Sequence, residues 1–268
     1  MKKILVLILI SIFTGVYGQN KMLVNAQIKA EYLCSFLIDT TDTYSLQNEM
    51  QTVLLDTVNK RQVFLPEGKF RKDSLFQNNG DLTTMVNNFS RFRSIIPFAV
   101  YVDEHSRQAV VTADVIKNEK VFYRETYRQP QWTLTDSTKI WHNVVLKKAT
   151  THYKGKDWTA WYAPSIQIPA APYKFKGLPG LVVQLYDKKK FYEYTLQKLE
   201  KKPVTYILDL SEGQEISPVN FFREALKTSQ KAALMYLSKF KVKIQTKDGK
   251  EISPQAKKIR FNNEIELY

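Results

Sequence analysis

The sequence predicts a mainly β protein of the α+β class, in which a curved antiparallel sheet, half-barrel or bowl carries one long helix. Three observations predict this fold. About a dozen short segments have the length and alternation of β-strands. One segment, 218–238, has the length and the apolar spacing of a long helix. Of the 268 residues, 44% are hydrophobic and 25% are charged, so the chain can bury a core and disordered classes are excluded.

The first 18 residues have the pattern of a secretory signal peptide. Two lysines follow Met1, an apolar run covers 4–13, and small residues lead up to Gly18. We expect cleavage after Gly18 and a single domain over 19–268, since no repeat or break in composition divides that range. The alternative is an uncleaved anchor helix, but an apolar run of about ten residues is short for a bilayer. The expected location is the periplasm or the periphery of the outer membrane.

The first half of the chain is predicted to be mainly strands. Residues 26–39 alternate apolar and polar side chains, which indicates a long half-buried strand. Cys34 alternates with Tyr32 and Phe36 there, so we expect this single cysteine to be a buried apolar residue. Residues 81–93 are expected to form a short helix, with Asp81 as its candidate N-cap. The other predicted strands are 50–56 and 61–65, 98–103, 108–113, 119–127, and two less regular segments near 131–135 and 138–142.

The second half is predicted to contain two hairpins, a loop and the long helix. Ser217 is a favourable N-cap, and Pro218 takes the first helical position. Residues 164–180 contain four prolines and are expected to form an ordered loop. A transmembrane barrel is disfavoured because of the long helix and the charges on both strand faces. The predicted strands are 143–152 with 157–163, 181–187 with 190–197, then 204–208, and a tail pair at 241–246 and 257–267.

The segment Gly177-Leu178-Pro179-Gly180-Leu181 is the most distinctive motif. Proline fixes φ at the second position of a turn and glycine permits positive φ at the third, so Leu178 to Leu181 are predicted to form a type II turn. Gly177 permits a close approach of the backbone to a neighbour. Two interpretations remain open, namely a rigid corner that sets the fold and a loop that faces a ligand.

The stretch 149–187 resembles the GLPGLI family of exported proteins of the Bacteroidetes, known from its Porphyromonas set. The namesake motif ends here in Val182 where isoleucine is usual, and an Ala-Trp-Tyr triplet around Trp161 and the sequence Pro-Tyr-Lys-Phe over 172–175 precede it. The resemblance is specific over 143–200. It implies an exported protein without an assigned activity, and a fold similar to the bowl-shaped N-terminal module of a secreted bacterial peptide N-glycanase.

Two departures from the family pattern are visible. Ala171 stands where members often have glycine, and Leu146 stands where many have cysteine. Any disulfide that such relatives form is therefore absent here, since Cys34 is the only cysteine.

Aromatic residues gather around the motif, and all four tryptophans lie within 30 residues of one another. They indicate either an aromatic core beneath the proline-rich loop or an exposed platform for a sugar or peptide. Trp158 and Trp161 are three residues apart and so fall on opposite faces of a strand, which leaves at most one pointing outward. The candidate ligand-binding residues are Trp158, Trp161, Tyr162, Tyr173 and Phe175.

The sequence contains no recognisable catalytic, metal-binding or nucleotide-binding motif. The three histidines, His105, His142 and His152, are interpreted as surface or strand residues, although His142 and His152 could meet across the predicted hairpin. No zinc-type spacing, nucleophile elbow, P-loop or dinucleotide fingerprint occurs. We therefore expect no metal and no cofactor, and no catalytic residue is assigned.

Positive charge is concentrated in the second half. Residues 135–268 contain 24 basic and 13 acidic residues, a net charge of +11 (24 − 13), with three consecutive lysines at 188–190. For an exported protein this favours anionic glycans or envelope surfaces over nucleic acid. The alternative is that the lysines keep strand edges soluble. We expect a monomer with no transmembrane span after cleavage.

Three functions are compatible with these features. The favoured one is a non-catalytic envelope-associated module that binds a peptide, a glycan or an outer-membrane protein. The alternatives are a hydrolase with an unrecognised site and a carrier of a hydrophobic ligand in the concavity of the sheet. Four triplets also resemble the short O-glycosylation sequon of the Bacteroidetes envelope, with Thr40, Thr57, Ser74 and Ser137 as candidate acceptors.

Overall fold

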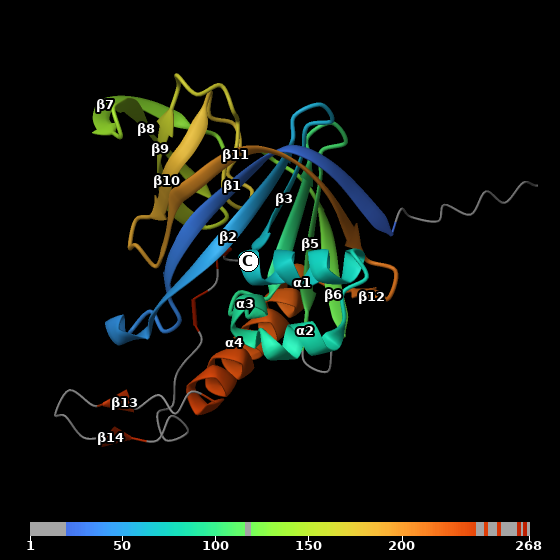
Figure 1. Ribbon diagram of the computed structural model, residues 1–268. Coiled ribbons are helices and arrows are strands. Elements are labelled where there is room, and N and C mark those ends of the chain that lie inside the picture. The colour runs from blue at the N-terminus through green and yellow to red at the C-terminus, as the bar shows by residue number, and fades with distance from the viewer. Residues whose placement is uncertain are drawn as a thin grey trace, which may run out of the picture.

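The computed structural model describes residues 20–115, 119–239, 244–245, 251–252, 262–263 and 265–266. The protein is mostly β, with one large open sheet and few helices, which confirms the predicted fold class at this level. Figure 1 shows the sheet bent into an arch, with the helices gathered at one end of it. The predicted signal peptide, residues 1–18, lies outside the described residues.

Twelve strands of the described residues form the large sheet. Neighbouring strands run antiparallel, except β12 and β6 at one edge, which are parallel. The edge strands β12 and β7 do not pair, so the sheet stays open. From edge to edge the strands are β12 (Gly213–Glu215), β6 (Lys120–Thr126), β5 (Gln108–Asp114), β4 (Phe98–Asp103), β3 (Arg61–Pro66), β2 (Leu46–Asp56), β1 (Lys21–Leu37), β11 (Tyr192–Asp209), β10 (Leu181–Asp187), β9 (Lys156–Ala163), β8 (Val144–Tyr153) and β7 (Thr133–Trp141).

The long pair β1 and β11 forms the top of the arch (Figure 1). Its register shifts between Ala26 and Ile28 and again between Glu31 and Tyr32. Such bulges bend a strand and increase its twist, which lets one pair of strands serve both halves of the sheet. The sequence predicts separate strands at 190–197 and 204–208, whereas β11 is continuous, because β1 is long enough to pair along its whole length.

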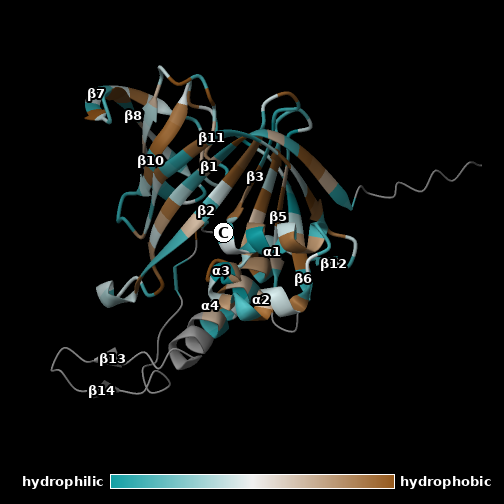
Figure 2. Ribbon diagram, viewed as in Figure 1, coloured by the Kyte–Doolittle hydropathy of each residue, from teal (hydrophilic) through white to brown (hydrophobic). Residues whose placement is uncertain are grey.

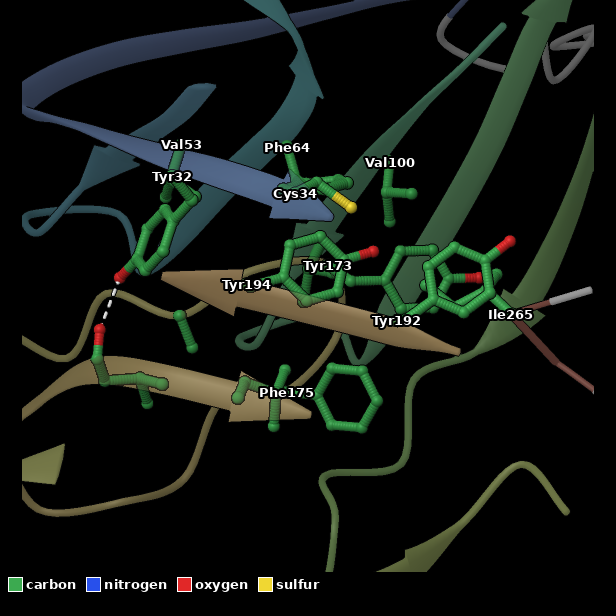
Figure 3. Close-up of a cluster of buried hydrophobic side chains, with 14 of the residues drawn as sticks. Tyr32, Cys34, Val53, Phe64, Val100, Tyr173, Phe175, Tyr192, Tyr194 and Ile265 are labelled. Atoms are coloured by element: carbon green, nitrogen blue, oxygen red, sulfur yellow. Dashed lines mark hydrogen bonds between the residues drawn. The ribbon is translucent and has the colours of Figure 1, made fainter. Parts of the chain in front are cut away.

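One face of the sheet, called here the inner face, carries the larger apolar core. The strands alternate hydrophobic and hydrophilic residues (Figure 2), and along β1 the residues Tyr32, Cys34 and Phe36 point inward. Cys34 is fully buried, as predicted. Figure 3 shows Cys34 among Tyr173, Tyr194 and other aromatic side chains. The Tyr32 hydroxyl donates a hydrogen bond of 2.7 Å to the carbonyl of Val182 in β10 and so links two strands that β11 separates.

Helix α1 (Glu67–Gln77) covers the opposite face of β2 to β6. The sequence does not predict this helix, because its apolar residues form no stripe. Its attachment is ionic instead: Lys69 lies 2.9 Å from Asp114, and Lys72 lies 3.1 Å from the same carboxylate. Phe70 adds an apolar contact with Tyr206.

Helix α4 (Pro218–Lys239) begins on the inner face. Phe221 packs edge-on against Tyr123 of β6, and Phe222 packs edge-on against Phe98 of β4. The amide of Asn220 donates to the Ser217 hydroxyl, so the predicted cap is present.

The region 81–93 forms two short helices, α2 (Leu82–Asn87) and α3 (Phe89–Phe92), where one helix is predicted. The Asp81 carboxylate accepts from the Thr84 amide, as a cap does. A single turn of 3-10 helix lies at Thr43–Ser45. No helix in the described part of the chain has the length and apolar composition to cross a membrane.

The tail differs from its predicted strand pair at 241–246 and 257–267. Strand β13 (Ile244–Gln245) pairs with β14 (Glu251–Ile252), and most of 257–267 lies outside the described residues. The described residues near the C-terminus, 262–263 and 265–266, are not in strands. Ile265 enters the inner core instead.

Candidate functional site

The proline-rich loop 164–180 packs into the inner face of the sheet. Its buried residues include Tyr173 and Phe175, which are each 1% exposed. The Tyr173 ring contacts Phe64 and Phe98 edge-on, and the centroid of Phe175 lies 4.4 Å from that of Trp158. The loop is therefore part of the core, which favours the aromatic-core interpretation.

Four of the five candidate ligand-binding residues have no surface to offer a ligand. Trp158, Tyr162, Tyr173 and Phe175 are all between 1% and 2% exposed, because Trp158 and Tyr162 of β9 pack beneath the loop that carries Tyr173 and Phe175. Their assignment to a ligand site is corrected accordingly. Trp161 is half-buried and lies on the outer face, so the predicted division of the two tryptophans between faces is confirmed.

Trp161 belongs to a polar row on the outer face. The Lys139 ammonium lies 4.4 Å from the centroid of the Trp161 ring and donates to the Gln184 side chain at 2.5 Å. Gln184 in turn donates to Glu193 at 2.6 Å. This row fixes the lysine above the ring and links four strands, β7, β9, β10 and β11.

The motif Gly177-Leu178-Pro179-Gly180-Leu181 does not form the predicted type II turn. The Gly180 amide donates to the Leu178 carbonyl at 2.9 Å, so a tighter three-residue turn is centred on Pro179. The Leu181 amide, which would close a type II turn, donates instead to Ile166 at 3.1 Å. The Leu181 amide is therefore bonded to a carbonyl at the start of the loop, and not to the Leu178 carbonyl of a local turn.

Both motif glycines adopt positive φ, 107° at Gly177 and 141° at Gly180. A Cβ at Gly180 would lie 2.2 Å from the carbonyl oxygen of Ala163, which no side chain tolerates. A Cβ at Gly177 would meet the flexible side chain of Gln129. Gly180 is thus required by backbone packing, in agreement with the rigid-corner interpretation.

A cluster of charges is buried beneath the loop. The Lys174 ammonium has no exposed surface and lies 2.6 Å from a carboxylate oxygen of Glu266 and 2.6 Å from one of Glu125. The Tyr173 hydroxyl also donates to Glu266 at 2.6 Å. Lys154 pairs with both carboxylates, at 2.6 Å from Glu125 and 3.4 Å from Glu266. Two ammonium groups thus balance two carboxylates.

This cluster joins four separate parts of the chain: the loop, β6, the β8–β9 turn and the C-terminal segment. Burial by itself raises the pKa of Glu266. The charges of Lys174 and Lys154 and the hydrogen bonds outweigh burial, so the pKa of Glu266 lies below its ordinary value and the group is ionised near neutral pH.

An apolar cavity lies on the inner face between the end of β1, Ile95 and Ile96, the first turns of α4, and Ile265. Its volume is about 40 Å³, which is close to the space of a single water molecule. Pockets for drug-sized ligands measure roughly 300–1,000 Å³. This cavity does not accommodate a lipid, so it gives no support to the alternative of a hydrophobic carrier.

A larger polar pocket, called here the lysine pocket, lies where the β8–β9 and β10–β11 turns meet. Its volume is about 310 Å³. The residues that give it its chemistry are Thr40, Lys156, Lys188, Lys189, Phe191 and Asn262.

The two turns that form the lysine pocket are tied together. The Lys188 amide donates to the Asp157 carbonyl at 2.8 Å. The Asp187 carboxylate accepts from the amides of Lys189 and Tyr192 and so shapes its own turn. The Lys156 ammonium lies 5.2 Å from the centroid of the Tyr192 ring. These contacts fix the backbone around the pocket, while the side chains of Lys188 and Lys189 are exposed.

The charge balance of the lysine pocket is positive. Three lysines line it against two aspartates, and Asp187 is buried and engaged by backbone amides. The other carboxylate, Asp157, is exposed and lies 2.7 Å from Nδ1 of His152. That hydrogen bond holds the pKa of Asp157 below its usual value. An anion entering the pocket therefore meets a net positive charge.

The histidines do not form a joint site. His142 lies in the β7–β8 turn, whereas His152 pairs with Asp157 at the other end of β8. The expectation that they could meet across the hairpin is therefore wrong, because the register places them at opposite ends of one strand. In the ranges that the structure covers, no three His, Cys, Asp or Glu side chains gather as metal ligands do.

Sequence reasoning identified the lysine run at 188–190 but missed the rest of the pocket. Lys156, Thr40 and Asn262 come from distant segments, and no local signal connects them. Lys174 and Glu266 were also missed, because the two residues are far apart in the sequence and neither carries a local signal of burial.

The candidate glycosylation acceptors differ in how far their side chains are exposed to solvent. Thr57, in the β2–β3 turn, and Ser137, in β7, are exposed, whereas Thr40 and Ser74 are half-buried.

No family model matches this chain, and no curated protein matches it. Two solved structures of PNGF-II, from two space groups, are similar to it, each with a TM-score of 0.47. The sequence identities are 14% and 13%, and each match covers 75% of this chain and 33% of that chain. The chain thus spans about a third of the length of these structures.

Replacement of Gly180 by alanine is expected to lower the free energy of unfolding by roughly 3 kcal/mol, since a strained φ and a forced contact each cost about 1–3 kcal/mol. Gly155→Ala is the matched control: Gly155 also has positive φ, 77°, but lies in an exposed turn. Its cost is about 1 kcal/mol. Equal losses for the two variants in urea unfolding would contradict the close approach to Ala163.

Replacement of Lys174 by methionine is expected to lower the free energy of unfolding by about 3–5 kcal/mol, because it leaves Glu266 buried without its main partner. The double variant Lys174→Met/Glu266→Leu should recover most of this loss, since Lys154 and Glu125 remain as a matched pair 2.6 Å apart. A double-mutant cycle by urea unfolding measures the coupling. Additive losses would show that the two side chains do not interact.

Stability should fall in acid partly through Glu266. Its folded pKa lies below the ordinary value of about 4.3, so its charge stabilises the fold above that pH and the contribution disappears as the pH drops further. The unfolding free energy of the wild type should therefore decline more steeply between pH 5 and about pH 3 than that of Glu266→Gln. Glu212→Gln, at an exposed position, should keep the wild-type slope. Parallel curves for all three proteins would refute this role.

Proposed function

We propose that residues 19–268 form an exported, envelope-associated binding module whose ligand is an anionic glycan held in the lysine pocket. The lysine pocket carries this proposal, because a net positive pocket of about 310 Å³ falls within the size range of small-ligand sites. The signal-peptide pattern of residues 1–18 supports export to the periplasm or to the periphery of the outer membrane. The resemblance to the GLPGLI family supports the same compartment.

The side chains around the lysine pocket match the groups of an acidic saccharide. Lysine ammonium groups attract carboxylates or phosphates, and Lys188 and Lys189 are exposed enough to reach a ligand. Thr40 provides a hydroxyl for hydrogen bonds with sugar hydroxyls, and Asn262 holds Thr40 at the pocket by accepting from its backbone amide at 2.8 Å. Phe191 supplies an apolar surface for the face of a sugar ring. A peptide with acidic side chains would use the lysines but has less need of the neutral polar groups.

A second candidate function is hydrolysis at the same pocket. One observation favours it: His152 and Asp157 form a hydrogen-bonded pair beside the pocket, and such a pair orients an imidazole as a general base. Both side chains are more than half exposed, at 69% and 57%, so the pair lies in water rather than in an enclosed site. Binding without chemistry is therefore the favoured function.

Three finer features belong to the proposal. The helix 218–238 packs on the sheet beyond its first turns, the mature protein is a monomer, and it acts without a metal or cofactor. A net charge of +12 after removal of residues 1–18 favours the monomer, because two copies repel each other.

The double variant Lys156→Ala/Lys188→Ala should bind fluorescently labelled tetragalacturonate roughly tenfold more weakly than the wild type, since exposed charge pairs contribute up to about 1 kcal/mol each. Fluorescence anisotropy at low and high salt measures this loss. Salt should weaken wild-type binding, and neutral maltotetraose should bind poorly in either case. Lys201→Ala/Lys202→Ala is the matched control, since it removes the same charge from exposed positions on β11.

Unchanged affinity in the Lys156→Ala/Lys188→Ala variant would contradict the assignment of the lysine pocket. Release of new reducing ends from tetragalacturonate, abolished by His152→Ala, would establish hydrolysis instead. Equal loss of affinity in the two lysine pairs would point to a general charge effect, which also contradicts a specific pocket.

A further inference from the structure

The two edges of the large sheet differ in how they are protected. At one edge β12 has three residues, and the Arg124–Glu215 ion pair at 2.5 Å reaches across its junction with β6. At the other edge β7 has nine residues and pairs only with β8 within the described chain (Figure 1). An unpaired strand of this length presents a row of free backbone donors and acceptors, which is a template for another strand.

The hairpin geometry determines which backbone groups of β7 are open. His142 and Asn143 both have positive φ, 43° and 65°, as a two-residue type I′ turn requires. The residues that flank such a turn, Trp141 and Val144, form a hydrogen-bonded pair, and such pairs alternate with non-bonded ones. Thr138 and Ile140 therefore direct their amides and carbonyls away from β8, toward the open edge.

The usual protection of an edge strand is missing beyond the bulge that lies between Leu134 and Thr138. The lysine on this strand, Lys139, points onto Trp161 and Gln184 and so does not guard the edge. Ile140 is 69% exposed, and its cross-strand neighbour Val145 is 48% exposed. An apolar strip thus accompanies the open backbone groups, which is the combination that strand addition uses.

Charge indicates which partner fits this edge. Residues 133–153 contain Lys139, Lys147 and Lys148 but only one acidic residue, Asp136. Pairing β7 with β7 of a second copy would bring these lysines together between two chains that each carry a net charge of +12 after removal of residues 1–18 (38 − 26). A strand with carboxylates has the opposite charge and no such repulsion.

We propose that the open edge of β7 binds an extended segment of an acidic partner protein as a thirteenth strand. Residues opposite each other across a strand pair share a face. The partner residue opposite Ile140 is therefore apolar, and the partner residues on either side of it are acidic, in keeping with the net positive charge of residues 133–153. This surface is separate from the lysine pocket, so the proposal does not depend on the proposed function.

The probe is a fluorescein-labelled peptide of eight residues that alternates valine and glutamate, added to the full mature chain. Fluorescence anisotropy should show saturable binding, and a valine–lysine peptide of equal length should bind at least tenfold more weakly. Methylation of alternate peptide nitrogens on one edge of the probe should abolish binding, whereas methylation on the other edge should not, because only one edge faces β7.

Two variants test the location. Ile140→Glu removes the apolar contact and adds repulsion, and Thr138→Pro removes an outward amide that no ladder bond uses. Each should weaken binding of the valine–glutamate peptide at least tenfold, with an unchanged circular dichroism spectrum. Val58→Glu is the matched control, since Val58 is 76% exposed in the distant β2–β3 turn and its substitution adds the same charge.

Equal binding of the two edge-methylated peptides would overturn the proposal, as would retained binding in both the Ile140→Glu and Thr138→Pro proteins. Light scattering after size exclusion provides the remaining outcome. A dimer of the wild type that Ile140→Glu dissociates would show that a second copy occupies the edge, and it would overturn the acidic partner.

Discussion

The ion pair between Lys174 and Glu266 is the contact on which the inner face depends. Both side chains have no exposed surface, and burying two such charges is costly unless each is paired and hydrogen-bonded. Glu125, Lys154 and the Tyr173 hydroxyl meet that condition. The cluster therefore has one satisfactory arrangement, and it requires the proline-rich loop, β6 and the C-terminal segment to be in place together. The apolar packing around it adds stability, whereas the charges specify position.

This constraint explains the composition of the distinctive motif. Aromatic residues of the loop fill the space on the inner face of the sheet. Lys174 pairs with the carboxylate of Glu266. Gly180 allows the backbone to pass close to Ala163 before it enters β10. Each residue type answers a packing or charge requirement of the interior. The motif is thus an architectural element, and its aromatic residues are explained without a ligand.

Local signals in the sequence account for much of the fold, because alternation and turn residues act over a few positions. The burial of Cys34 and the cap at Asp81 were predictable for this reason. Helix α1 was not, since ion pairs with a distant strand hold it and no apolar stripe marks it. The charge cluster was also beyond prediction, because Lys174 and Glu266 are 92 residues apart and neither has a local reason to be buried. The same applies to the lysine pocket, which combines two turns, Thr40 and Asn262.

Side chains fill the interior of the sheet, and no described cavity there is large enough for a small ligand. The apolar cavity of about 40 Å³ is too small for an organic ligand, and both proposed binding surfaces lie at turns and edges that the core supports. The lysine pocket lies at the turns of β8–β9 and β10–β11, and the open backbone of β7 lies one strand beyond β8. Strand β8 thus takes part in both surfaces, with its turn at one and its pairing at the other. Because β8 is anchored to the core through Leu146, Ala149 and Thr151, a ligand at either surface meets a preformed scaffold and loses little free energy to ordering it.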